Sequence, residues 1–67
     1  MTTGEKLRKY RGKKSVEQVA SDLGVSVSAY TKYERNERTP RPPVMLKIAE
    51  YYKKSVQTIF FNTSGDD

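Results

Sequence analysis

The chain has 67 residues, enough for one small domain, and carries a formal net charge of +5 with neither cysteine nor histidine. The missing thiols and imidazoles exclude disulfides, thiolate zinc sites and the commonest general base, so no metal or cofactor is expected. No apolar run is long enough to span a bilayer and MTTGEKLRKY lacks the apolar core of a signal peptide, so a cytoplasmic protein is expected.

The first expected helix is GEKLRKYR, residues 4–11, in which Leu7 and Tyr10 form a narrow apolar stripe. Cations crowd this segment and the turn after it, namely Lys6, Arg8, Lys9, Arg11, Lys13 and Lys14. A basic patch, with the acidic residues 66–67 kept apart in the tail, suits nucleic acid or anionic lipid. Charge on a small domain can also serve only solubility.

A second helix is expected over residues 16–23. Ser15 stands three residues before Gln18, which is a capping-box pattern at a helix start. Apolar residues then recur at the spacing of one helix face, at Val16, Val19, Ala20 and Leu23. Gly24 follows as the residue typical of a left-handed helix end, so the helix stops there.

The stretch VSVSAYTKYER, residues 25–35, begins with the strict alternation typical of a half-buried strand. A strand would put Tyr30 and Lys32 on one face. A helix capped by Ser26 instead separates two faces, so the helix is preferred. The apolar and aromatic face contains Ala29, Tyr30 and Tyr33. The small, polar and basic face contains Val27, Ser28, Thr31, Lys32 and Arg35.

A loop, NERTPRPP, leads into a fourth helix whose first turn suits Pro42 and Pro43. The expected buried stripe of that helix is Val44, Leu46 or Met45, Ile48, Ala49 and Tyr52. Ser55 can cap a last short helix that carries Val56, Ile59 and Phe60. Residues 62–67 have nothing to bury and are expected to form a flexible acidic tail. The pattern therefore predicts five short helices and no strand.

Two helices joined by a tight glycine turn, the second polar and basic on its outer side, form a helix-turn-helix. SVEQVASDLGVSVSAYTKYERNERTP resembles this motif in Cro and phage-repressor-type regulators, also called the xenobiotic-response-element family. The residues that fit the family pattern in order are Ser15, Ala20, Leu23, Gly24, Ser26, Tyr33, Glu34, Arg35 and Pro40. LKIAEYYKKSVQTIF is similar to the family's fourth and fifth helices, so the resemblance extends over about residues 4–61.

The resemblance implies an all-α, compact five-helix, lambda-repressor-like DNA-binding domain over residues 1–61, with the helix-turn-helix at about 15–36. In the family, the second helix of the motif lies in the DNA major groove. The base contacts expected here are Val27, Ser28, Thr31 and Lys32. The phosphate contacts expected are Ser26, Arg35, one of Arg38 and Arg41, and Lys13 with Lys14 ahead of a helix N-terminus. Lys13 and Lys14 can equally form a solvated turn.

The sequence departs from the family pattern at several positions. Val16 and Val27 stand where glutamine is frequent, and Lys53 stands where glycine is usual. Lys32 is then the only long base-reading donor on the outer face, and lysine can donate to guanine O6 and N7. Modest direct readout is therefore expected, with more reliance on phosphates and DNA shape.

The resemblance also implies an internal ion pair between Arg11 and Glu34, which is preferred to a base contact because phosphates repel a bare carboxylate. Aromatic residues near the C-terminus exceed what one small core needs, and exposed apolar patches mark partner surfaces. A homodimer is therefore expected, with interface candidates Tyr51, Tyr52, Val56, Phe60 and Phe61.

The expected function is sequence-specific binding of double-stranded DNA by a transcriptional repressor that acts as a dimer on a palindromic operator. The alternative is an antitoxin or antirepressor-type module that uses the same fold to hold a protein. Val16, Val27 and the surplus aromatics favour that alternative, and the basic outer face opposes it. An enzyme is not expected, because histidine, cysteine and paired carboxylates are missing. A membrane-surface role would require the apolar helix faces that the core needs.

Overall fold

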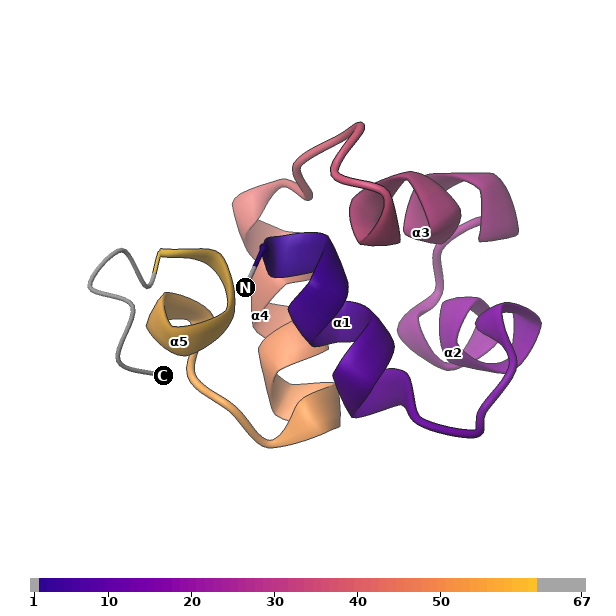
Figure 1. The fold of residues 1–67 in the computed structure, drawn as a ribbon, viewed down its shortest axis with the longest axis horizontal. Coiled ribbons are helices and arrows are strands. Elements are labelled where there is room, and N and C mark those ends of the chain that lie inside the picture. Colours follow the sequence, from indigo (N-terminus) through magenta and orange to yellow (C-terminus); the bar gives the residue numbers. More distant parts are fainter. Residues whose placement is uncertain (1, 62–67) are drawn as a thin grey trace.

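The computed structural model describes residues 2–61, so Met1 and the expected tail lie outside the described residues. The helices in chain order are α1 (Thr3–Arg11), α2 (Val16–Leu23), α3 (Val27–Glu34), α4 (Pro42–Tyr52) and α5 (Val56–Phe60). Figure 1 shows α2 and α3 together on one side of α1, with α5 on the other side and α4 behind. The five-helix, all-α prediction is confirmed, and residues 27–34 form a helix rather than a strand.

Serine side chains start three of the helices, as the sequence predicts. The hydroxyl oxygens of Ser15, Ser26 and Ser55 each accept a hydrogen bond of 3.0 Å from the backbone N–H three residues later. Each bond satisfies one of the amides that a helix N-terminus leaves unpaired. Helix α4 begins differently, with Pro42 and Pro43 in its first turn and no side-chain capping bond. The sequence therefore encodes these helix starts locally.

Helix α1 begins one residue earlier than expected, because Thr2 forms a complete capping box with Glu5. The Thr2 hydroxyl accepts from the Glu5 N–H at 3.1 Å, and the Glu5 carboxylate accepts from the Thr2 N–H at 2.8 Å. The bond from the Thr2 backbone lowers the pKa of Glu5 below its usual 4.5. The T-x-x-E spacing of Thr2 and Glu5 carries this signal in the sequence.

Three helices end in the same left-handed turn, in which two successive N–H groups bond back to carbonyls of the last helical turn. The left-handed residues are Gly24 with φ 76°, Asn36 with φ 60° and Lys53 with φ 57°. After α3, for example, the Glu37 N–H donates to the Lys32 carbonyl at 2.9 Å. Lys53 is the least suited of the three, because a long side chain disfavours this conformation.

The core lies where α1, α2, α3, α4 and α5 meet. Its buried members are Leu7, Val19, Ala20, Leu23, Tyr30, Tyr33, Ile48, Ala49 and Ile59. The sequence left open whether Leu46 or Met45 belongs to the buried stripe of α4. Met45 is buried, whereas Leu46 is 58% exposed. Burial raises the pKa of Tyr30 far above its usual value, and its hydroxyl shares a 2.7 Å hydrogen bond with that of Tyr52. The helix-face predictions thus give the inner residues correctly.

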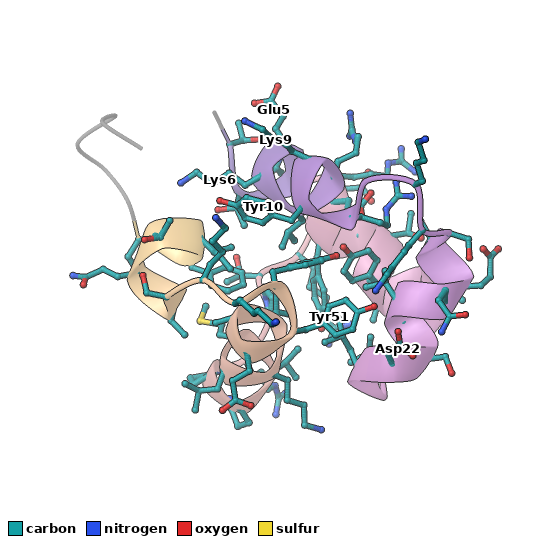
Figure 2. The ribbon with its side chains drawn as sticks, turned by 90° about the horizontal axis from the view of Figure 1, so that it is seen from below. Glu5, Lys6, Lys9, Tyr10, Asp22 and Tyr51 are labelled. Atoms are coloured by element: carbon teal, nitrogen blue, oxygen red, sulfur yellow. The ribbon has the colours of Figure 1, made fainter. Side chains whose placement is uncertain are left out.

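Lys6 does not belong to an exposed basic patch, which corrects the interpretation of the N-terminal cations. Its side chain is buried, and its ammonium donates to the Thr58 carbonyl of α5 at 2.6 Å (Figure 2). The Thr3 hydroxyl donates to the next carbonyl, that of Ile59, at 3.2 Å. Carbonyls in the last turn of a helix have no partner within the helix. Two side chains of α1 therefore cap the end of α5.

Candidate nucleic-acid interface

Helices α2 and α3 form a helix-turn-helix whose turn is set by backbone geometry. Gly24 takes the left-handed conformation, and the Val25 N–H donates to the Ala20 carbonyl at 3.0 Å. Ser26 can then cap α3, which begins at Val27, immediately after the turn. The buried Tyr30 and Tyr33 fix α3 against the core and leave its opposite face to the solvent.

The open face of α3 carries most of the side chains expected to contact bases. Val27 is 41% exposed, and Ser28 and Lys32 are exposed as well. Thr31 is half-buried at the edge of this face, so less of its side chain is accessible to a ligand than in the other three residues. Together these residues offer a methyl-rich side chain, two hydroxyls and one ammonium, which match thymine methyls and the acceptors of guanine or adenine.

The ion pair between Arg11 and Glu34 is present and binds α3 to α1. The Arg11 Nε donates to Glu34 Oε2 at 2.7 Å, and its Nη2 donates to Oε1 at 3.1 Å. The remaining Nη1 donates to the Lys14 carbonyl at 2.7 Å in the turn before α2. The bond to Glu34 raises the pKa of Arg11. One guanidinium therefore orients α1, α3 and the α1–α2 turn, and Glu34 is unavailable for DNA.

A second link between α1 and the end of α3 is not foreseen from the sequence. The Gly4 N–H donates to Asn36 Oδ1 at 2.9 Å, and Asn36 Nδ2 donates to the Thr2 hydroxyl at 3.1 Å. A Cβ on Gly4 would overlap the Glu34 carbonyl oxygen, so only glycine permits this approach. The signal for Asn36 was its place at a helix end, where asparagine tolerates the left-handed conformation.

The cations expected at phosphates divide into two groups. Lys13, Arg38 and Arg41 are exposed. Arg35 is also exposed, and it forms an ion pair with Glu37 across 3.3 Å. Lys14 instead extends towards α4, where its ammonium donates to the Tyr51 hydroxyl at 3.0 Å and lies 4.8 Å from the ring centroid. The structure therefore places Lys14 in an intramolecular contact.

Tyr51 connects Lys14 to α2. Its hydroxyl donates to Asp22 Oδ2 at 2.6 Å, and Figure 2 shows the two side chains beside each other. This bond lowers the pKa of Asp22 below its usual 3.8, and the contact with Tyr51 raises the pKa of Lys14. The sequence did not reveal this connection, because its members are far apart in the chain.

The prediction that the C-terminal aromatics are surplus to the core is wrong for Tyr51 and Tyr52. Tyr52 bonds to Tyr30 and stacks on Tyr10 with ring centroids 5.6 Å apart, and Tyr51 makes the bonds described above. Val56 and Phe60 also pack partly against the core. Of the interface candidates, which all lie within the described residues, Phe61 alone is largely exposed, with 56% of its surface accessible. Leu46, which was not a candidate, is as exposed as Phe61.

Helix N-termini add backbone donors to this surface. The Ser26 hydroxyl oxygen accepts from the Ala29 N–H, which leaves its own hydrogen able to donate to a phosphate. The first amides of α2 and α3 have no partner within their helices and favour an anion. Helix α4 differs, because prolines have no N–H to offer. A phosphate near α4 would therefore depend more on side chains such as Arg41 than one near α2 or α3.

Within residues 2–61, no three acidic, histidine or cysteine side chains gather as metal ligands would. None of the helices in this part of the chain has the length and apolarity needed to cross a bilayer. The chemistry available at the open face of α3 is accordingly that of hydrogen bonding, apolar contact and positive charge.

Comparison with known proteins agrees with this geometry. No curated protein matches the chain significantly. A family model described as helix-turn-helix matches residues 5–59, which include all of α2, α3 and α4. The chain belongs to the Cro/C1-type helix-turn-helix family and is a DNA-binding transcription regulator.

Proposed function

We propose that this protein is a sequence-specific transcriptional repressor that binds a palindromic operator as a dimer. The observation that carries the proposal is the open face of α3, which is polar and basic while its opposite face is buried in the core. Bidentate bonding between Arg11 and Glu34 holds α3 in place, so its outer side chains meet DNA with a fixed orientation. Such preorganisation lowers the entropic cost of binding.

The expected readout follows from the side chains on that face. Lys32 donates to guanine O6 and N7, Ser28 bonds to a base edge, and Val27 contacts a thymine methyl. Arg35, Ser26, Lys13 and the arginines of the α3–α4 loop bind phosphates, which sets position but carries no sequence information. Since long donors are few, DNA shape contributes much of the discrimination. Repression requires only that the operator be occupied, which DNA binding by two such surfaces would provide.

An apolar groove between α4 and α5 supports the dimer. It has a volume of about 350 Å³ and is lined by Pro42, Met45, Leu46, Val56 and Phe61. Leu46 and Phe61 line the groove and are also more than half exposed. In a two-fold interface each copy presents the same patch, so these two side chains of one copy can enter the groove of the other. Two recognition helices would then read half-sites about 34 Å apart.

Replacement of Leu46 by Gln tests this interface. We expect weaker self-association in sedimentation velocity, because a polar amide would replace an apolar contact in the groove. The neighbouring Lys47→Gln, which is also exposed, is the matched control and should leave the association unchanged. A wild-type protein that stays monomeric on an operator containing both half-sites would refute the dimer.

Fluorescence anisotropy tests the operator. A labelled duplex from the DNA upstream of the protein's own gene is compared with a random duplex of equal length across a salt series. Tighter binding to the upstream duplex, with a steep salt slope for both, supports the proposed repressor. Equal and weak binding to both duplexes contradicts it. The apolar groove would then favour the second candidate, a module of the antitoxin or antirepressor type that holds a protein.

A further inference from the structure

Glu37 is an exception in the charge pattern around the recognition helix. Residues 23–49 contain only two acidic side chains, and one of them, Glu34, is buried against Arg11. The other is Glu37, which is exposed in the turn that follows α3. The cations of the same segment are Lys32, Arg35, Arg38, Arg41 and Lys47. A carboxylate in this position opposes DNA binding by simple repulsion, so its placement requires an explanation.

The structure gives Glu37 a partner. Its Oε2 lies 3.3 Å from Nη2 of Arg35, the residue at the end of the recognition helix that is expected to bind a phosphate. The Arg35 side chain is 64% exposed and that of Glu37 is 48% exposed. Because water reaches both groups, a phosphate can reach the guanidinium too and can compete with the carboxylate for it.

The backbone of Glu37 is also held in place. Its N–H donates to the Lys32 carbonyl at 2.9 Å. The preceding Asn36 is bonded through its side chain to Gly4 and Thr2 of the α1 N-terminus. The turn therefore holds the Glu37 backbone beside Arg35, so that its carboxylate stays within reach of the guanidinium in the unbound protein.

We propose that Glu37 restrains Arg35 and so sets the sequence-independent part of the DNA affinity. In the unbound protein the carboxylate neutralises the guanidinium. A phosphate must displace the carboxylate, which then takes up a cation from solution and offsets part of the counterion release that drives binding. This inference rests on the proposed DNA-binding function. It predicts that Glu37 weakens binding to every duplex alike, while Lys32 and its neighbours supply the discrimination.

The first test compares Glu37→Gln with the wild type on a random duplex, by fluorescence anisotropy across a salt series. The expected result is about two- to fivefold tighter binding at low salt, the range of an exposed ion pair. The salt slope should steepen by up to about 0.9, the contribution of one phosphate. Glu50→Gln on α4 is the matched control, because it makes the same charge change at an exposed site far along the chain. Glu37→Asp retains the charge and should bind like the wild type.

A double-mutant cycle with Arg35→Gln shows whether Glu37 acts through Arg35. In the Arg35→Gln background, Glu37→Gln should change the affinity no more than Glu50→Gln does. An equal gain with and without Arg35 would identify Glu37 as a merely repelling charge and overturn the proposal. Loss of operator affinity alone in Glu37→Gln would identify a base contact and would overturn it as well.

The two proposals fail in distinguishable ways. A wild-type protein that binds neither the operator nor the random duplex refutes the DNA-binding function, and this inference with it. A wild-type protein that binds DNA, with Glu37→Gln and Glu50→Gln indistinguishable from each other, refutes the restraint alone. Thermal melting of the four single variants should match that of the wild type, since both partners of this pair are exposed.

Discussion

At the scale of single residues, the cations of this protein serve two different purposes. Lys6, Arg11 and Lys14 each donate to a group on another part of the fold. Lys13 and Lys32 are exposed and face the solvent. Cations that are near in sequence therefore do not form one continuous surface. The net charge alone overstates how many of them can contact DNA.

Lys32 is the residue on which base discrimination should depend most. Lys32→Ala should weaken binding to the operator and lower discrimination at one base pair by about 1–3 kcal/mol. Anisotropy on the operator and on duplexes substituted at single positions measures this effect. Lys13→Ala is the matched control, because loss of a phosphate contact weakens binding to all sequences equally. An equal loss on operator and random DNA would make Lys32 a phosphate contact.

Arg11 should matter for folding rather than for DNA contact. Arg11→Ala leaves the buried carboxylate of Glu34 without its partner, which should lower the free energy of unfolding by about 3 kcal/mol, the lower end of the range for a buried pair because Arg11 is partly exposed. Urea denaturation followed by circular dichroism measures this loss. Exchange of the exposed Arg8 for Ala is the control and should change the stability little. Unchanged stability together with lost DNA binding would place Arg11 at the DNA instead.

At the scale of secondary structure, the helix ends are not equally well suited to their sequences. Gly24 and Asn36 accept the left-handed conformation readily, whereas a lysine does not. The end of α4 nevertheless forms, because the N–H groups of Lys53 and Lys54 bond to the Glu50 and Ala49 carbonyls at 3.2 and 2.9 Å. The helix end therefore contains strain that a substitution can relieve.

Lys53→Gly should raise the free energy of unfolding by about 0.5–1 kcal/mol, because glycine removes the strain at a small cost in unfolded-state entropy. Thermal and urea melting measure the gain. The same exchange at Lys47, within α4, should lower stability by about 1 kcal/mol. Opposite signs at the two positions would show that the backbone conformation is the cause, and equal signs would contradict that explanation.

At the scale of the whole molecule, the response to pH follows from which groups are shifted. The pKa values of Glu5 and Asp22 lie below their usual 4.5 and 3.8 in the folded protein. Folding therefore gains stability from these groups at neutral pH, and the gain is lost as the pH falls through their folded pKa values. Because histidine is missing, the stability should change little between about pH 5 and 8.

Acid denaturation of the wild type and of Tyr51→Phe tests this expectation. Without the Tyr51 hydroxyl, Asp22 loses the bond that lowers its pKa most, and nuclear magnetic resonance should report a higher pKa for its carboxyl group. The pKa of Glu5 should not change in that variant, since Thr2 is the main cause of its shift. An unaltered Asp22 titration would show that Tyr51 does not hold this carboxylate in solution.

Most of the fold could be predicted from the sequence because its determinants are local. Serine caps, a turn glycine and apolar residues at helical spacing gave the helices and the inner face of α3 correctly. The partners of Lys6, Lys14 and Tyr51 could not be predicted, because each lies on a segment far away in the chain. The alternation at residues 25–28 was a local pattern that favoured a strand, and burial of Tyr30 and Tyr33 in one helix face outweighs it.

The capping of α5 by Thr3 and Lys6 has a consequence for protein synthesis. The chain leaves the ribosome from its N-terminus, at about 5–20 residues per second. The helix that supplies the capping groups is therefore made before the carbonyls that receive them, which lie 52 and 56 residues later in the chain, at residues 58 and 59. Until the α5 segment leaves the exit tunnel, the Lys6 ammonium has no Thr58 carbonyl to which it can donate. Native packing of α1 is therefore expected to be completed only after residues 58 and 59 have left the tunnel.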